Sequence, residues 1–128
     1  MPIIVIEDDK ILRALQVILD PATSQARCDA LQDYFAVDAP DITPWLEKLR
    51  ASAGALYPAS LRMVSDQTKL GTALPDADAL VVEGLTVGVE ELTAAPNLRL
   101  VQKFGIDTRN IDLAACEAAN VPVASAPE

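Results

Sequence analysis

The chain has 128 residues, with 10 basic and 19 acidic side chains, two cysteines and no histidine. Without histidine, it cannot contain a Ser–His or Cys–His catalytic pair or a His-ligated metal, and two cysteines are too few for a structural zinc site unless a partner adds ligands. The formal charge of −9 argues against a nucleic-acid partner, because binding to a phosphate backbone needs a basic surface.

The two cysteines, Cys28 and Cys116, lie far apart in a chain without the pattern of a signal peptide. No run approaches the roughly 18 apolar residues that a membrane-spanning helix needs. We therefore expect two free thiols in a reducing, cytoplasmic environment and no contact with a membrane.

The chain opens with a continuous apolar run at residues 3–6. A run without alternation predicts a strand that is covered on both faces, as in a parallel sheet. The next apolar residues, between 11 and 19, share one helical face. This spacing predicts a helix with Asp9 as its N-cap and Pro21 as its stop.

Two further helices are predicted before the next strand. The first covers about residues 23–35 and is followed by a loop at 37–41. The second starts at Thr43, with Pro44 in its first turn, and ends at Gly54. Trp45 lies on the apolar face of this helix, so we expect it to be either a core residue or an anchor between subunits.

The second half alternates short strands with short helices. Cys116 falls on an apolar helix face and is expected to be buried. Asn120 suits the left-handed position after a helix. Strands are predicted at 61–64, 79–82, 98–103 and 121–124, helical segments at 89–94 and 112–119, and a short polar helix or a turn at 68–74.

This alternation predicts a single α/β domain over residues 1–128, with a flavodoxin-like, doubly wound, five-stranded parallel sheet. Ligands of such sheets bind beyond the carboxyl ends of the strands. The residues at those ends are Glu7-Asp8-Asp9, Ser65-Asp66, Glu83-Gly84-Leu85 and Phe104-Gly105.

The five glycines form no GxGxxG, GxxxxGK or GxSxG motif, so the chain has no dinucleotide fingerprint, P-loop or nucleophile elbow. Gly84 and Gly105 each follow a predicted strand. Either glycine could let backbone N–H groups approach a small anion, or could simply serve a tight turn that needs a positive φ.

The acidic cluster Glu7-Asp8-Asp9 also has two interpretations. Adjacent carboxylates at a strand end can bind Mg²⁺. Alternatively, the acids can stabilise the positive end of the following helix. The run from Ile3 to Asp9 resembles the opening of a bacterial receiver domain, which would make the chain a signalling module. However, Glu83 stands where a receiver has its phosphoacceptor aspartate, and Lys103 is followed by Phe104 rather than proline.

A second resemblance covers residues 74–127. This part is similar to the N-terminal, substrate-binding domain of the D-2-hydroxyacid dehydrogenase family, which includes the phosphoglycerate dehydrogenases. The combination of a loop glycine, Asn-Ile-Asp-Leu and Val-Pro-Val at this spacing is its most specific part. The matching segments are Asp76–Val82, Glu90–Leu92, Ala94–Val101, Lys103–Ala115 and Val121–Ala124.

The resemblance implies an enzyme that transfers a hydride between a nicotinamide cofactor and a 2-hydroxy or 2-oxo acid. In this family an NAD-binding Rossmann domain follows the position of Pro127, and the catalytic Arg, Glu and His lie in or beyond it. We therefore expect no cofactor site, no metal and no catalytic residue in this chain, and no catalysis by the chain alone. Residues 21–60 look like a subgroup insertion.

The family resemblance assigns substrate contacts to two loops of this domain. The substrate carboxylate is held partly by N–H groups of the loop that matches Phe104, Gly105 and Ile106, and the loop with Gly84 and Leu85 faces the same cleft. Glu83 would repel a carboxylate, a charge that Lys103 could offset.

A truncated gene or a proteolytic fragment without an independent role remains an alternative interpretation of the chain. The surface left by a missing domain should then expose apolar residues and promote self-association.

Overall fold

The structure, a computed structural model, describes residues 1–34, 41 and 43–125. Five strands form one parallel sheet in the order β2-β1-β3-β4-β5. This is the flavodoxin-like order that the sequence predicts. The strands are β1 (Ile3–Glu7), β2 (Ser60–Val64), β3 (Ala79–Val82), β4 (Leu100–Lys103) and β5 (Val123–Ala124).

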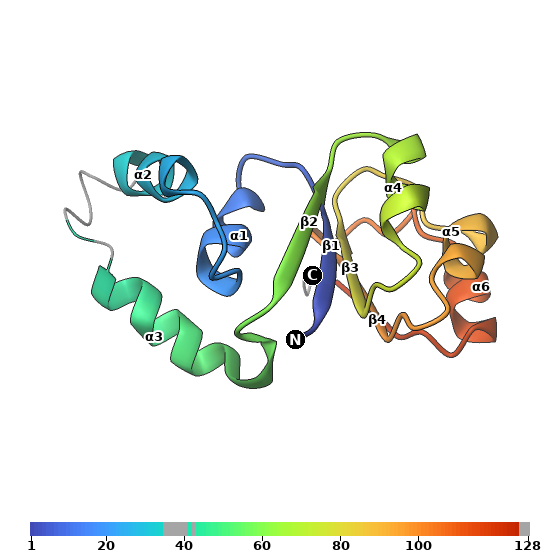
Figure 1. The fold of residues 1–128 in the computed structure, drawn as a ribbon. Helices are drawn as coiled ribbons and strands as arrows, with labels where there is room; N and C mark the ends of the chain where they lie inside the picture. Colours follow the sequence, from blue (N-terminus) through green and yellow to red (C-terminus); the bar gives the residue numbers. More distant parts are fainter. Residues whose placement is uncertain (35–40, 42, 126–128) are drawn as a thin grey trace.

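Helices lie on both sides of this sheet. In Figure 1, α1, α2 and α3 are on the side beside β2, and α4, α5 and α6 are on the other. In the described part of the chain, no helix combines the length and the apolar character needed to cross a membrane. The helices are α1 (Arg13–Leu19), α2 (Gln25–Tyr34), α3 (Thr43–Ala53), α4 (Gln67–Ala73), α5 (Val89–Ala94) and α6 (Leu113–Ala118), with a 3₁₀ turn η1 (Gly54–Leu56).

The first strand lies inside the sheet, between β2 and β3, and is covered on both faces, as its apolar run predicts. Ile4 and Ile6 pack with Leu12 and Leu19 on the α1 side, whereas Val5 belongs to the core on the opposite side. All three β1 residues are at least 95% buried. Consecutive residues of the run therefore contribute alternately to the two cores on opposite faces of the sheet.

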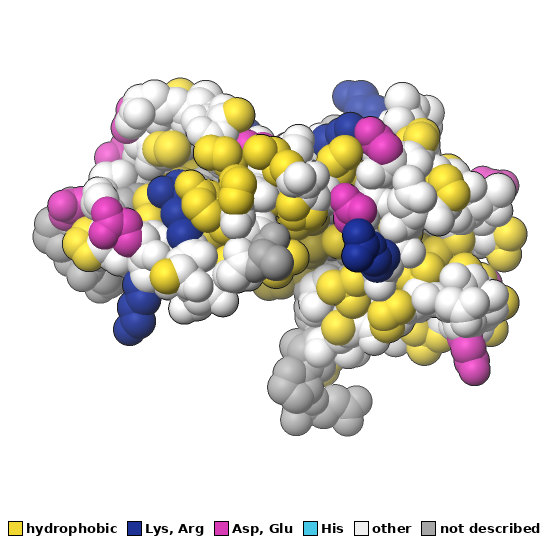
Figure 2. All heavy atoms as spheres, turned by 60° about the horizontal axis from the view of Figure 1, so that its bottom comes forward, with side chains coloured by type: hydrophobic (Ala, Val, Ile, Leu, Met, Phe, Trp, Pro, Cys, Tyr) yellow, Lys and Arg dark blue, Asp and Glu magenta, His cyan; other side chains and the backbone are white. Residues whose placement is uncertain are grey.

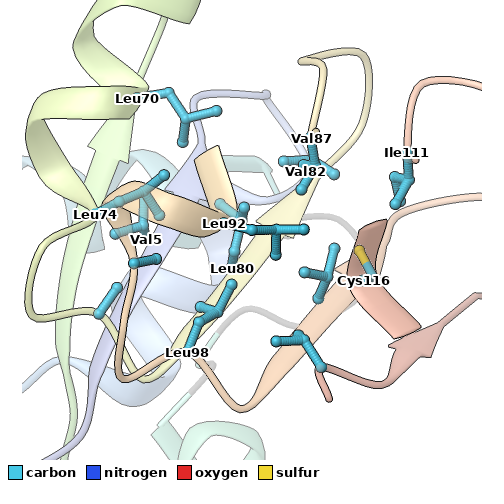
Figure 3. Packing of buried hydrophobic residues seen from close by; sticks show 14 of the residues in the cluster. Val5, Leu70, Leu74, Leu80, Val82, Val87, Leu92, Leu98, Ile111 and Cys116 are labelled. Atoms are coloured by element: carbon cyan, nitrogen blue, oxygen red, sulfur yellow. The ribbon is translucent and has the colours of Figure 1, made fainter. Parts of the chain in front are cut away.

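The larger core lies between the sheet and helices α4 to α6. Figure 3 shows side chains of β1 and β3 meeting those of α4, α5 and α6 there. Cys116 is 1% exposed, as predicted, and burial raises the pKa of its thiol. Leu70, Leu74, Leu80, Val82 and Val87 are completely buried in this core.

The start of α1 differs from the prediction. Asp9 does accept N–H hydrogen bonds, from Ile11 at 2.8 Å and Leu12 at 3.3 Å, but these bonds close a turn that precedes the helix. The helix begins at Arg13, and its N-cap Leu12 has helical dihedrals and no capping side chain. An aspartate can form such a local turn with its own backbone, which delays the helix by one turn.

Helices α2 and α3 form close to where they are predicted, but neither contains a buried residue. Trp45 is 38% exposed, so of its two expected roles the core position is wrong, while the anchor between subunits stays a prediction. Arg50 connects α3 to the fold, because its guanidinium donates to the carbonyls of Ile18 at 3.0 Å and Val17 at 2.9 Å. Most of the predicted loop at 37–41 lies outside the described residues.

The last helix also follows the sequence closely. Asp112 caps α6 by accepting the N–H of Ala115 at 3.0 Å. Asn120 has a φ of 59° in the position expected for it. The chain then returns to the sheet as β5, where the N–H of Val101 donates to the carbonyl of Pro122 at 3.0 Å.

Candidate functional site

Two loops lie side by side at the carboxyl ends of neighbouring strands β3 and β4. We call them the 83–86 loop (Glu83–Thr86) and the 104–106 loop (Phe104–Ile106). Val82 opposes Lys103 in the sheet register, and the N–H of Phe104 donates to the carbonyl of Val82 at 2.8 Å. The fold thus brings the predicted contact residues to one edge of the sheet: Gly84, Leu85, Phe104, Gly105 and Ile106.

The 104–106 loop presents apolar side chains and an unusual backbone to solvent. Phe104 is 38% exposed and Ile106 is 57% exposed. Between them, Gly105 has a φ of +124°, a value that residues with a Cβ rarely adopt. The turn interpretation of Gly105 therefore holds. Gly84 does not have a positive φ, so that interpretation is wrong for Gly84.

The N–H groups of the 83–86 loop converge on the carboxylate of Glu7, which stands at the end of β1. Its Oε1 accepts from the N–H groups of Glu83 at 3.2 Å, Gly84 at 2.9 Å and Leu85 at 2.7 Å. Its Oε2 accepts from Gly84 at 3.2 Å. Backbone N–H groups do meet an anion here, as one interpretation of Gly84 proposes, but the anion belongs to the protein.

The carbonyl groups of the same loop are bound from the β4 side. Lys103 is 7% exposed, and its ammonium donates to the carbonyl of Glu83 and to Oδ1 of Asn110, the latter at 3.2 Å. The Asn110 amide donates to the carbonyls of Leu85 at 2.8 Å and Glu83 at 3.2 Å. Lys103 therefore holds the backbone of Glu83, and no ion pair joins the two side chains among those the structure describes.

The end of the 83–86 loop is held by α4. The side-chain amide of Gln67 donates to the carbonyl of Thr86 at 2.7 Å, and its Oε1 accepts the N–H of Thr86 at 2.9 Å. Sequence reasoning missed the roles of Gln67 and Asn110. For Asn110, the family-like Asn-Ile-Asp-Leu segment was a signal, whereas nothing around Gln67 singled it out.

The three acids of the Glu7-Asp8-Asp9 cluster bind separate partners. Asp8 pairs with Arg13, with 2.6 Å between Oδ1 and Nε, and the guanidinium lowers the pKa of this carboxyl. Asp9 closes the turn before α1. No group of three or more metal-ligating side chains occurs within residues 1–34, 41 and 43–125. The Mg²⁺ interpretation therefore finds no support, and only Asp9 approaches the role expected near a helix start.

Beyond the 104–106 loop, Asp107 and Arg109 form an exposed ion pair. Arg109 Nη2 lies 2.6 Å from Asp107 Oδ2. Hydrogen bonds from the Arg109 side chain and backbone lower the pKa of Asp107 to about 2. The Arg109 guanidinium is therefore paired within the chain, shortly after the 104–106 loop in the sequence.

The described surface also has a hollow that lies away from these loops. A groove of about 1150 Å³ runs between α1 and α2, with Ile11, Ala14 and Leu31 among its apolar lining. None of the five predicted contact residues lines it. The candidate site is therefore an open edge of the sheet rather than this groove.

A comparison with known protein families shows to which family the chain belongs. Residues 22–128 match the model of the D-isomer specific 2-hydroxyacid dehydrogenase catalytic domain. The chain belongs to this family. The matched range includes most of the 21–60 segment, so the family model spans both α2 and α3 as well as the candidate loops.

Curated relatives of this dehydrogenase-family chain match about half of it. D-3-phosphoglycerate dehydrogenase of Mycobacterium leprae (strain TN) is 46% identical over 63 residues, which are 48% of this chain and 12% of the relative. The protein of that name from Mycobacterium bovis is 44% identical over 63 residues, with the same coverage. The match thus spans only about an eighth of each relative's length.

Solved structures extend the likeness to the whole fold. 3-Phosphoglycerate dehydrogenase of Entamoeba histolytica, with NAD+ bound, has a TM-score of 0.56 at 15% identity, covering 99% of this chain and 33% of that one. Phosphoglycerate oxidoreductase of Vibrio cholerae has a TM-score of 0.55 at 18% identity, covering 98% and 31%. The first strand and α1, which the family model does not reach, are therefore part of the shared fold.

NAD does not fit the residues that this chain places at its strand ends. A dinucleotide needs a glycine-rich turn whose free N–H groups face the pyrophosphate. At the end of β1 the chain has three consecutive acids instead, of which Glu7 is the last residue of the strand, and the N–H groups after β3 are already bonded to Glu7. The receiver interpretation also finds no support, because the family assignment excludes it and Asp8 is paired with Arg13.

Proposed function

We propose that residues 1–128 form the substrate-binding domain of an NAD-dependent D-2-hydroxyacid dehydrogenase related to the phosphoglycerate dehydrogenases. The full enzyme transfers a hydride between the nicotinamide and a 2-hydroxy or 2-oxo acid. The observation that carries this proposal is the family match over residues 22–128. The position of two open loops at the carboxyl ends of β3 and β4 supports it, because ligands of such sheets bind there.

In this proposal the substrate carboxylate accepts hydrogen bonds from the backbone N–H groups of Gly105 and Ile106, because the N–H of Phe104 already donates to the carbonyl of Val82. The left-handed backbone at Gly105 and the exposure of its two neighbours support this role. Gly84 and Leu85 border the substrate on the β3 side. The buried ammonium of Lys103 donates to the carbonyl of Glu83 and adds a positive charge close to both loops.

The NAD-binding domain and the catalytic Arg, Glu and His belong to parts of the enzyme other than these residues. Two observations support this division: the chain has no histidine, and its matches cover 12% of the curated relatives and about a third of the solved chains. The purified 128-residue chain should not oxidise NADH in the presence of pyruvate. Turnover above the buffer control would contradict the division.

The substrate contacts can be tested on the 128-residue chain by backbone amide NMR. D-lactate, as a 2-hydroxy acid probe, should shift the amides of 104–106 in a saturable way, with a dissociation constant in the millimolar range or weaker. Succinate at equal ionic strength controls for nonspecific effects of carboxylates. Lactate shifts confined to other parts of the sheet, or equal shifts with succinate, would contradict the proposed site.

We also propose that the isolated chain associates with itself and that the enzyme works in the cytoplasm. On the α1 side of β3 and β4, the neighbouring side chains Ala79, Val81 and Leu100 are only partly buried. Figure 2 shows apolar side chains gathered in two groups on one face of the molecule. The free thiols of Cys28 and Cys116 favour a reducing compartment.

A further inference from the structure

The N–H groups of the 83–86 loop donate their hydrogen bonds to a charged side chain of the protein itself. Three consecutive N–H groups, from Glu83, Gly84 and Leu85, lie 2.7–3.2 Å from Oε1 of Glu7. Convergent backbone N–H groups form a binding site for anions, and a carboxylate is among the anions that such a site accepts. Glu7 thus takes the position that a carboxylate or phosphate of a ligand would otherwise occupy.

The loop is held in this conformation from its other side as well. Lys103 and Asn110 bind the carbonyls of Glu83 and Leu85, and Gln67 binds both backbone groups of Thr86. These contacts do not involve Glu7. The loop should therefore keep its N–H groups directed towards position 7 even when the carboxylate there is removed.

The charges around these N–H groups also disfavour an anionic ligand. Glu83 contributes a second carboxylate within the loop, and it is exposed. Lys103 is the nearby cation, but its ammonium is bonded to the carbonyl of Glu83 and to Asn110. A ligand with a phosphate group near β3 would face two negative side chains and find no free N–H among these three.

We propose that Glu7 is a resident anion of the 83–86 loop and a specificity-determining residue. It keeps anionic groups away from the N–H groups of 83–85 and so favours a substrate with one anionic group, the carboxylate at the 104–106 loop. The substrate class is then a small 2-hydroxy or 2-oxo monocarboxylate without a phosphate. This second part rests on the proposed function, whereas the role of Glu7 in the loop does not.

The role of Glu7 is tested by amide NMR with inorganic phosphate as the probe, at constant ionic strength. In the unaltered chain, the amides of Gly84 and Leu85 should not shift. In Glu7→Ala they should shift saturably, with affinity at least about tenfold above any residual response of the unaltered chain. Glu83→Ala is the matched control, because it removes the same charge from the same loop and leaves Glu7 in place. It should remain unresponsive.

Three results would overturn this role: phosphate shifts in the unaltered chain as large as in Glu7→Ala, no shifts in a folded Glu7→Ala, or equal responses of Glu7→Ala and Glu83→Ala. If Glu7→Ala does not fold, Glu7→Gln provides the test. Its neutral amide should accept these hydrogen bonds more weakly, so hydrogen exchange of the Gly84 and Leu85 amides should be about tenfold faster. Unchanged exchange would overturn the role.

The substrate class is tested separately with D-glycerate and 3-phosphoglycerate, which share the 2-hydroxy acid and differ in the phosphate. In the unaltered chain, D-glycerate should shift the amides of 104–106 at least as strongly as 3-phosphoglycerate, and Glu7→Ala should gain about tenfold in affinity for 3-phosphoglycerate alone. Tighter binding of 3-phosphoglycerate by the unaltered chain would refute the class. If neither acid shifts these amides, the proposed function and the class fail together, while the phosphate titration still decides the role of Glu7.

Discussion

At the residue scale, two side chains of opposite charge hold the 83–86 loop. Glu7 binds the N–H groups of the 83–86 loop, and Lys103 and Asn110 bind its carbonyl groups. A carboxylate can only accept and an ammonium can only donate, so each is suited to one side of the peptide backbone. Hydrogen bonds with a charged partner are also stronger than neutral ones. The loop is therefore ordered by side chains of β1 and β4, the two strands that flank β3, together with Asn110.

The contribution of the buried ammonium can be measured with Lys103→Met. Methionine keeps an unbranched apolar side chain but leaves the carbonyl of Glu83 without its charged donor. We expect a loss of about 1–3 kcal/mol in the free energy of unfolding, because the carbonyl of Glu83 loses a charged donor and keeps only the neutral amide of Asn110. Urea denaturation followed by circular dichroism measures it. Lys10→Met, at an exposed lysine, should change stability by less than about 0.5 kcal/mol.

Alanine substitutions should distinguish the two glycines of the candidate site. Gly105→Ala places a Cβ at a φ of +124° and should cost about 1–3 kcal/mol of stability. At Gly84, the nearest atom to a Cβ would be Glu7 Oε2 at 4.0 Å, which is ordinary contact. Gly84→Ala should therefore lie within about 0.5 kcal/mol of the parent in thermal unfolding. Equal losses at both positions would contradict this distinction.

Residue types at strand ends could be predicted, but their partners could not. The sequence places Glu7, Gly84 and Gly105 at one edge of the sheet because parallel strands end together. It does not show that Glu7 faces the loop after β3, since this depends on β1 and β3 being neighbours although 71 residues lie between the two strands in the chain. A positive φ, one of the two interpretations offered for both glycines, is found at Gly105 and not at Gly84, whose N–H donates to the Glu7 carboxylate.

At the element scale, the described helices differ in how they are held. Helices α4, α5 and α6 each contribute buried residues to the larger core. Helices α2 and α3 have no buried residue. Helix α3 is attached to α1 by Arg50, whose guanidinium also lies 5.2 Å from the centre of the Tyr57 ring. A helix with few buried contacts opens at low free-energy cost.

The attachment of α3 can be tested by Arg50→Ala, which removes two hydrogen bonds to the end of α1. We expect α3 amides to exchange at least about tenfold faster with deuterated solvent, with β1 and β3 unchanged. Lys48→Ala is the matched control, because it removes one charge from an exposed position of the same helix. Hydrogen-exchange mass spectrometry resolves these segments. Equal exchange in both variants would contradict a role for Arg50.

The sequence predicted most elements because their burial pattern is simple. The runs of β1 and β3 are apolar without interruption, which is the signature of strands covered on both faces. The apolar face of α3 suggested a core position for Trp45, but periodicity shows that a helix has an apolar side and not what covers it. Trp45 illustrates this limit, because its helix forms as expected and yet leaves it 38% exposed.

At the scale of the whole molecule, charge and apolar surface act against each other. The chain carries a formal charge of −9, which opposes close approach of two copies. Leu100, opposite Ala79 in the register, shares a face with residues that pack on the α1 side of the sheet, yet it is only partly buried. Association should therefore be weak at low salt and stronger when salt screens the repulsion.

Sedimentation velocity tests this balance. The average mass should rise with protein concentration, and raising NaCl from 20 to 500 mM should increase it further, since the screening length falls from about 20 Å to about 4 Å. Leu100→Gln should reduce the associated fraction because it removes apolar area from the proposed contact. Val89→Gln, at a 65% exposed position on α5 across the sheet, should leave it unchanged. A monomer under all conditions, or equal effects of the two variants, would show that this sheet face does not mediate association.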